Sequence, residues 1–346
     1  MQNSEVLRQQ LHSIHRKSYP AYKGLKGAYR FENFILSIDH VQGDPFASPS
    51  HISIQISHRD SAFPSEYYKD VLTRTTLCDY LTRQFEQQVN RYTFRAKGSG
   101  KSGLISVSHC GQEILSRTAC EITGRGITAR FFIGFPANGR TINALELEKI
   151  LFDYLPVCVQ KAFFYSSTNK KELRNFMELA LDQEYIRQEL LRRKLTAFVA
   201  DGSILPRESG ISSRPMKNAI PFSAPESLRI SMELPHKGTL TGMGIPQGIT
   251  LIVGGGYHGK STLLNALELG VYNHIPGDGR EYVITDCTAV KLRSEDGRFI
   301  KDVDISLFIN DLPNQKDTHC FSTQDASGST SQAAGIVESI EAGSHL

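Results

Sequence analysis

The chain has 346 residues, 40% of them apolar and 22% charged, which is enough for about two globular domains with ordinary cores. The net charge is only +3, but residues 1–200 hold 27 Lys and Arg against 19 Asp and Glu, whereas residues 201–346 hold 12 against 17. No run approaches the roughly 18 apolar residues of a membrane span, and the N-terminus lacks the apolar h-region of a secretory signal. The six cysteines form no C-x-x-C pair. The sequence therefore predicts a cytoplasmic protein without a zinc site. A basic mitochondrial transit peptide is the alternative for the N-terminus.

The first 200 residues predict an N-terminal α+β domain. Helical spacing of apolar residues predicts helices, and alternating β-branched and aromatic residues predict strands. The expected helices lie within 1–20 and at 66–90, 143–163 and 170–197, and the expected strands at 29–41, 51–57, 103–109, 112–122 and 126–135.

The densest basic segment, residues 91–130, carries seven Lys and Arg against two Glu, together with Tyr92 and Phe94. Cationic side chains interleaved with aromatic ones suit a nucleic-acid backbone and its bases, so Arg95, Lys97 and Lys101 are candidate RNA contacts. A solvated charged strand face would give the same pattern.

The composition changes near residue 200, where four prolines and many small residues between Ala200 and Ser227 predict a linker or extended loop. We therefore place the expected boundary between a basic domain, 1–205, and a second domain, 206–346. Within the second domain, GITLIVGGGYHGKSTLLNALELG predicts a strand, a glycine-rich loop and a helix, and 281–286 predicts the next strand.

The glycine-rich loop of the second domain fits the phosphate-binding pattern G-x-x-x-x-G-K-[ST]. In that pattern, glycines let backbone N–H groups and a helix N-terminus face an anion. Lys260 would neutralise the β- and γ-phosphates of ATP, and Ser261 would bind Mg²⁺ through its hydroxyl. The predicted nucleotide-binding residues are Gly254, Gly255, Gly256, Gly259, Lys260, Ser261 and Thr262.

An earlier Gly-Lys-Ser, in RAKGSGKSG, does not fit the same pattern. Arg95 stands where the first glycine is required, and the alternating residues LISVSH after it predict a strand in place of a helix. Because a helix N-terminus would be missing, Lys101 and Ser102 are predicted to lie in a basic hairpin loop. The sequence therefore predicts one nucleotide site.

A second motif, STQDASGSTSQAAGIVESIEAG, places Ser327 and Gly328 at the start of a predicted helix. It resembles the signature motif of ABC-class ATPases, with A-S-G-S-T-S-Q in place of L-S-G-G-Q. In such a motif a serine hydroxyl, a glycine amide and a helix N-terminus meet the γ-phosphate of ATP held by the opposite subunit. The candidate residues are Ser327, Gly328, Ser329 and Gln332, and an ordinary helix N-cap is the alternative.

Nearly the whole chain resembles the family described as predicted ATPases of the ABC class. The resemblance rests on stretches such as LKGAYRFENFILSIDHVQGDPFASPS, GSGKSGLISV, LTAFVADGSILPRESG, GMGIPQGITLIVGGGYHGKSTLLNALELGVYNHIPGDGRE and FSTQDASGSTSQAA. It implies an α/β architecture with a separate N-terminal domain, an ABC-type nucleotide-binding core, ATP and Mg²⁺ as ligands, and a homodimer that sandwiches ATP.

The sequence departs from this family in one respect. In ABC-class ATPases an acidic Walker B strand follows the signature helix, supplying an Asp for Mg²⁺ and a Glu for the attacking water. Here the predicted signature helix reaches Glu341 and the sequence ends at Leu346. We therefore expect a C-terminally truncated core, no identified catalytic residue and impaired hydrolysis. Asp286 and Asp311 precede the signature and are predicted to be strand-end and loop residues.

Two functions remain open from the sequence. The first is an ATP-driven conformational switch. The second is an RNA-binding module that uses the basic N-terminal half and has ATP as a regulator. His236 and Phe222 lie upstream of the phosphate loop, where an adenine-stacking group could sit.

Overall fold

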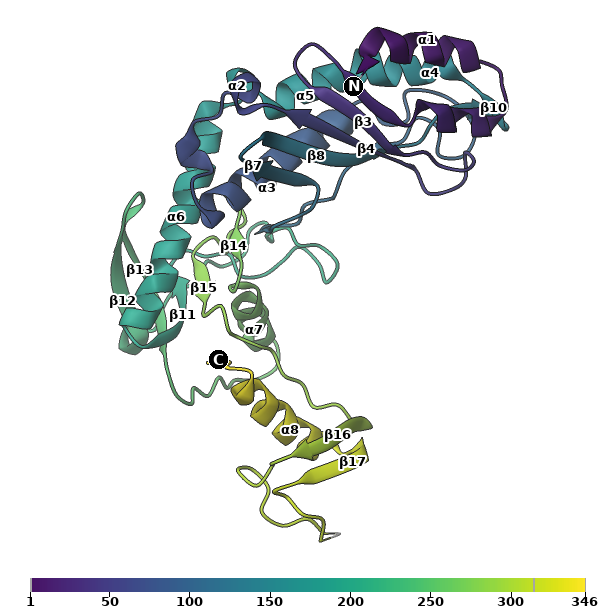
Figure 1. Ribbon diagram of the computed structural model, residues 1–346. Coiled ribbons are helices and arrows are strands. Elements are labelled where there is room, and N and C mark those ends of the chain that lie inside the picture. Colours follow the sequence, from purple (N-terminus) through teal and green to yellow (C-terminus); the bar gives the residue numbers. More distant parts are fainter. Residues whose placement is uncertain (1, 314, 346) are drawn as a thin grey trace. The chain divides into compact units, whose positions relative to one another are not determined.

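The computed structural model describes residues 2–313 and 315–345, and it divides into two compact units, residues 1–181 and 182–346. Figure 1 shows the order of their elements. The composition-based boundary after residue 205 lies inside the second unit. Among the described residues, no helix combines the length and apolar character that crossing a bilayer requires.

The first unit is built on a seven-stranded sheet in the order β1-β2-β3-β4-β8-β5, with β7 also paired to β8. Every pairing is antiparallel except that of β1 with β2. The strands are β1 (Gln2–Asn3), β2 (Gly27–Arg30), β3 (Ile35–His40), β4 (Ser50–Ile56), β5 (Ile105–Ser106), β7 (Cys120–Thr123) and β8 (Gly126–Ile133). Short strands β6 (Glu113–Ile114), β9 (Ala137–Asn138) and β10 (Thr141–Ile142) complete the unit.

Helices of the first unit bury one face of this sheet. Phe85 of α3 meets Phe131 of β8 edge to face, and it also packs against Phe163 of α5. Such buried aromatic pairs add to the large apolar area that each ring removes from water. The helices are α1 (Ser4–Ile14), α2 (His58–Ser61), α3 (Val71–Val89), α4 (Ala144–Glu148), α5 (Leu155–Phe163) and α6 (Lys170–Arg192), the last of which continues into the second unit.

Several sequence predictions for this unit differ from the structure in detail. The strand predicted at 103–109 is only the two-residue β5, and the strand predicted at 112–122 is interrupted between β6 and β7. The strand predicted at 29–41 is a hairpin, because the chain turns after β2 and the Phe31 N–H donates to the carbonyl of Phe34. The helix predicted at 143–163 contains a π-helical segment, Lys149–Tyr154, between α4 and α5. Pro156 lies two residues after that segment, and a proline removes an N–H and crowds the preceding turn.

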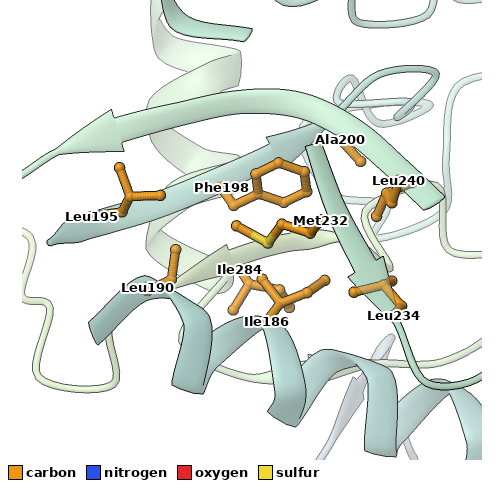
Figure 2. Close-up of a cluster of buried hydrophobic side chains, with 9 residues drawn as sticks. All are labelled: Ile186, Leu190, Leu195, Phe198, Ala200, Met232, Leu234, Leu240 and Ile284. Carbon is orange, nitrogen blue, oxygen red and sulfur yellow. The ribbon is translucent and has the colours of Figure 1, made fainter. Parts of the chain in front are cut away.

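The second unit contains a four-stranded antiparallel sheet in the order β12-β13-β11-β15. Its strands are β11 (Leu195–Ala200), β12 (Arg229–Leu234), β13 (Gly238–Pro246) and β15 (Val283–Thr285), and the short β14 (Asn273–His274) lies ahead of β15. All six residues of β11 are buried, because this central strand is covered on both faces. On one face, Phe198 packs with Met232, Ile284 and residues Ile186 and Leu190 of α6 (Figure 2).

The other face of the sheet packs against α7 (Lys260–Leu269) through Ala197, Val199, Ala266 and Leu267. Beyond β15, β16 (Arg298–Val303) and β17 (Phe321–Ala326) form a hairpin whose apolar side packs against α8 (Gly328–Glu341). The segment between Ala200 and Ser227, predicted to be a linker, is partly an ordered loop. The Gly202 N–H donates to the carbonyl of Phe222, and Leu205 and Ala224 are buried.

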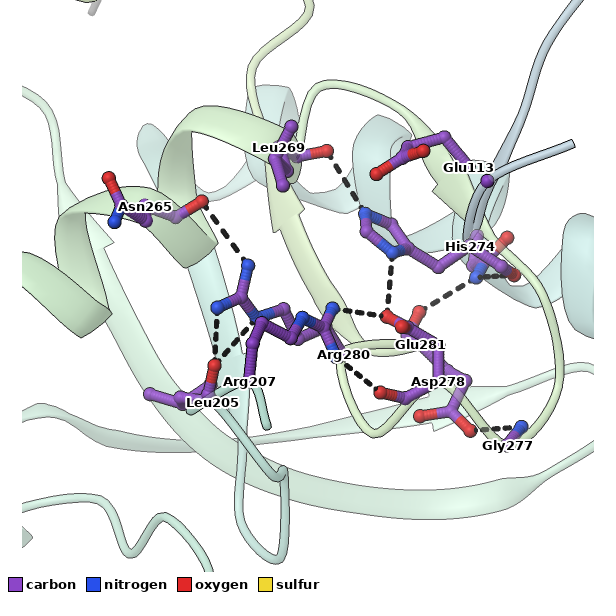
Figure 3. A network of polar contacts seen from close by, with 12 residues as sticks. Glu113, Leu205, Arg207, Asn265, Leu269, His274, Gly277, Asp278, Arg280 and Glu281 are labelled. Atoms are coloured by element: carbon purple, nitrogen blue, oxygen red, sulfur yellow. Dashed lines mark hydrogen bonds and ion pairs between the residues drawn. The ribbon is translucent and has the colours of Figure 1, made fainter. Parts of the chain in front are cut away.

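A buried polar network anchors the C-terminal half of α7 (Figure 3). His274 Nε2 contacts the carbonyl of Leu269 at 3.1 Å, and Arg280 donates to the carbonyls of Asn265 and Leu205. Asp278 Oδ2 lies 2.7 Å from His274 Nδ1 and 2.9 Å from Arg207, with which it forms a buried ion pair. Cations at the end of a helix are favourable because the last carbonyls carry partial negative charge.

The charges around Asp278 decide its ionisation. Burial alone would raise the pKa of its carboxyl, but the hydrogen bond and charge of His274, and then those of Arg207, outweigh it and hold the pKa below the usual 3.8. The ionised carboxylate is thus favoured more in the folded chain than in the unfolded one.

We predict that Asp278→Asn lowers the free energy of unfolding at pH 7 by about 3–5 kcal/mol, because the buried Arg207 loses its charged partner and His274 loses its carboxylate contact. The stabilisation by a carboxylate of depressed pKa is complete above about pH 4 and is lost as the pH falls through the folded-state pKa. The difference between wild type and variant in urea unfolding should therefore shrink below that pH.

Asp311→Asn is the matched control, since Asp311 is exposed in a loop and the same change there should leave stability almost unaltered. Equal stability of the Asp278 variant and wild type at pH 7 would show that the network does not anchor α7.

Candidate nucleotide-binding site

The loop 254–259 leads directly into α7, which begins at Lys260. Gly259 is the N-cap with a φ of 80°, in the left-handed region where a residue with a Cβ would be strained. The first hydrogen bond across this start joins the Leu263 N–H to the carbonyl of Gly259. The amides of Lys260, Ser261 and Thr262 thus precede the helical ladder and are the kind of donors that bind anions.

Side chains of the loop already engage its backbone. Lys260 Nζ donates to the carbonyl oxygens of Gly254 at 2.7 Å and Gly255 at 2.5 Å. The Gly255 N–H donates to His258 Nδ1 at 3.2 Å. Lys260 is therefore held across the mouth of the loop, and His258 occupies an amide for which a phosphate oxygen would compete.

The residues present fit a nucleotide with Mg²⁺. Ser261 is exposed in the first turn of α7, and within residues 2–313 and 315–345 its hydroxyl has no hydrogen-bond partner. A free hydroxyl beside a cationic lysine and unpaired helix amides suits a magnesium-bound phosphate. Gly256 and Gly259 have open space where a side chain would project, so an anion could approach the backbone there.

The prediction of a buried strand ahead of this loop is wrong. Residues 249–253 have no strand conformation, and the side chains of Ile249, Leu251 and Val253 are 105%, 82% and 73% exposed. A strand needs a hydrogen-bonded neighbour, and no segment in the described part of the chain pairs with these residues. An apolar run alone cannot supply the neighbouring strand.

The earlier Gly-Lys-Ser lies in a turn, but this turn connects α3 to β5 and is not the hairpin loop that the sequence predicted. No helix follows it, and the chain continues into β5. Ser102 is buried and its hydroxyl donates to the carbonyl of Ser99 and accepts from the Ala137 N–H, so it serves the turn itself. Lys101 donates its backbone N–H to the carbonyl of Pro45.

The signature-like residues begin α8. Ser327 is the N-cap and its Oγ accepts from the Thr330 N–H, so the ordinary capping interpretation holds for this helix. The hydroxyl of Ser331 ties the preceding acidic loop to the same turn by accepting from the Glu295 N–H. Ser329 and Gln332 are exposed.

The remaining upstream and acidic candidates have structural partners. Phe222 is half-buried against the core beneath α7, and the His236 N–H donates to the Asp182 carboxylate. Asp286 directly follows β15 and accepts from the N–H and hydroxyl of Thr288, as expected of a residue at a strand end.

The contacts of His258 and the network around Asp278 were not predicted. The sequence carried a signal for both, since GGGYHGK places a histidine inside the phosphate loop and HIPGDGRE gathers four ionisable residues into a turn. Neither signal says which backbone atoms these side chains reach.

Comparison with known proteins agrees with this geometry. Residues 169–346 match the model of the P-loop domain of the ABC_ATPase family, and residues 4–166 match the model of the N-terminal domain of ATPases of the ABC class. The chain is also 36% identical over 141 residues to the uncharacterised protein MJ1628 of Methanocaldococcus jannaschii. That similarity covers 38% of this chain and 31% of the archaeal protein.

The P-loop match covers half of the chain, and the match to the N-terminal domain precedes it. The chain therefore belongs to the ABC-class ATPase family, whose P-loop domain supports nucleotide binding.

Proposed function

We propose that the chain binds ATP with Mg²⁺ at the loop 254–259 and the first turn of α7. The observation that carries this proposal is the arrangement of Lys260 across two loop carbonyls, directly beside unpaired helix amides and the free hydroxyl of Ser261. Lys260 would exchange its carbonyl contacts for the β- and γ-phosphates, and the amides of the turn would bind the phosphate oxygens. Ser261 would hold the metal ion, which screens the charge of the phosphates.

Signature residues of a second copy would complete the site. Ser327, Gly328 and Ser329 stand at the N-terminus of α8, a 14-residue helix whose first amides and hydroxyls suit a γ-phosphate. Closure of two copies around ATP would then act as a conformational switch.

We predict that Lys260→Ala weakens binding of a fluorescent ATP analogue with Mg²⁺ by about 10- to 100-fold, the value of one or two hydrogen bonds to a charged group. Lys101→Ala, in the other Gly-Lys-Ser, is the matched control and should bind like wild type. Unchanged binding by a folded Lys260 variant would contradict the site, and phosphate release recorded in the same titration measures hydrolysis.

We also predict that ATP with Mg²⁺ shifts wild-type protein from monomer toward dimer in sedimentation velocity, and that Lys260→Ala abolishes the shift. Nucleotide binding with the same sedimentation coefficient at every protein concentration would support the site and reject the sandwich.

RNA binding by the first unit is a second candidate function, favoured by the exposed loop around residue 95. The Arg95 guanidinium lies 4.9 Å from the ring centre of Tyr92, and Phe94 is 52% exposed at a φ of 60°. Lys97 is also exposed, whereas Lys101 is half-buried. Exposed cations beside an exposed aromatic ring suit single-stranded nucleic acid.

We predict that changing Arg95, Lys97 and Lys101 together to Ala weakens binding of a fluorescein-labelled single-stranded RNA. The slope of log affinity against log salt should flatten by up to about 2, because each phosphate neutralised by a cation contributes roughly 0.7 to that slope. Replacing three exposed cations elsewhere on the unit, Lys23, Lys26 and Arg30, is the matched control. An unchanged affinity and salt slope in the first variant would exclude this loop as an RNA site.

A further inference from the structure

Two cysteines of the first unit share one cavity. Cys78 lies on α3 and Cys120 begins β7, and both line a hollow of about 740 Å³ together with Arg74, Arg117 and Arg130. The two side chains are buried, 7% and 4% exposed, but the cavity gives a small molecule a route to them. Residues 42 positions apart in sequence are thus brought to one wall by the packing of α3 on β7.

The two thiols line the same cavity and are chemically unequal. The hydrogen bond between the Cys78 and Cys120 side chains lowers the pKa of Cys78, with help from the Ile122 N–H and the charge of Arg74. The same hydrogen bond, together with burial, raises the pKa of Cys120. Cys78 is therefore the more readily ionised thiol of the pair, and the thiolate is the form that attacks a disulfide.

The other buried thiols provide a contrast. Burial raises the pKa of Cys110 to about 11 and that of Cys158 to about 12, so both remain protonated. Cys287 and Cys320 are exposed and belong to the second unit.

The cavity also offers one uncommitted cation. Arg117 is tied to the buried carboxylate of Asp79, and Arg130 is paired with Glu121 at 2.9 Å. Arg74 has no ion pair within the part of the chain that the structure describes. It lies one helical turn before Cys78, where it can attract a negatively charged reactant toward the sulfur.

We propose that Cys78 and Cys120 form a thiol–disulfide exchange site that takes a small anionic disulfide of the glutathione type. The Cys78 thiolate attacks one sulfur of oxidised glutathione, forming a mixed disulfide and expelling one glutathione thiolate. Cys120 then loses its proton and attacks the Cys78 sulfur, which forms the Cys78–Cys120 bond and expels the second glutathione. Two cysteines are oxidised, one glutathione disulfide is reduced, and the two protein protons pass to the two glutathione thiolates.

The bond would join α3 to the strand beside it. Because α3 carries Phe85 into the core of the first unit, linking it to β7 restricts how far this helix can separate from the sheet. Glutathione redox state would thereby control opening of the first unit, independently of the nucleotide loop.

The test is to incubate the native full chain with oxidised glutathione, alkylate the remaining thiols, and map peptides without reduction by mass spectrometry. The expected product links the Cys78 and Cys120 peptides, lacks two hydrogens and disappears with dithiothreitol. The variant Cys120→Ser should accumulate one glutathione on Cys78, whereas Cys78→Ser and Cys78→Ala should leave Cys120 unmodified. Arg74→Ala should slow the exchange several-fold, while Arg125→Ala, outside the cavity, should not.

The variants are also made in a protein that carries Cys287→Ser and Cys320→Ser, so that glutathione on these exposed thiols is not mistaken for reaction in the cavity. The proposal is overturned if Cys78 and Cys120 remain fully alkylatable after unfolding while Cys287 of wild type carries glutathione. It is equally overturned if the link forms only in urea, or if Cys120 reacts with glutathione in the absence of Cys78.

Discussion

The nucleotide site depends on how the C-terminal half of α7 is held. His274 and Arg280 contact the carbonyls of Leu269 and Asn265, and the Asp278 carboxylate contacts His274 and pairs with Arg207. Thr285 adds a hydroxyl donor to the carbonyl of Leu267 at 2.7 Å. Since a helix is stiff along its axis, fixing its last turns also fixes the direction in which its first amides point.

The opposite end of α7 is held much less firmly. The loop 254–259 is exposed, and the residues before it pair with no strand in the described chain. Its internal contacts come from two side chains: His258, which a phosphate could displace, and Lys260, which a phosphate could attract. Binding must therefore offset the entropy of ordering this loop, while the helix behind it is already in place.

The two units carry separate chemistry. The second unit contains the phosphate loop and the helix N-terminus of the signature motif, whereas the first has an exposed basic loop and a thiol pair in a cavity. In the first unit, Asp79 fixes the segment between β6 and β7. Its buried carboxylate binds both Arg83 and Arg117 and accepts from the Leu115 N–H. Such a buried pair is costly to break, so the wall of the thiol cavity is well defined.

The sequence by itself determined some of the elements and the local chemistry of the phosphate loop, but it did not predict β11, β12 or β13 of the second sheet. Apolar periodicity predicted α3 and α6, alternation predicted β4 and β8, and the spacing of Gly254, Gly259 and Lys260 predicted a loop before a helix. These features depend on neighbours a few residues apart, so they can be read along the chain. The same local reasoning separated this loop from the Gly-Lys-Ser at residue 101.

Only the tertiary structure decided the features that need distant partners. Whether residues 249–253 form a strand depends on a neighbouring strand, and the bound position of Lys260 depends on the path of the whole loop. The approach of Cys78 to Cys120, and of Arg207 to Asp278, is set by packing between elements far apart in sequence. Hydrogen bonding, burial and the resulting pKa shifts arise from that packing, and for this reason no pattern of adjacent residues could reveal them.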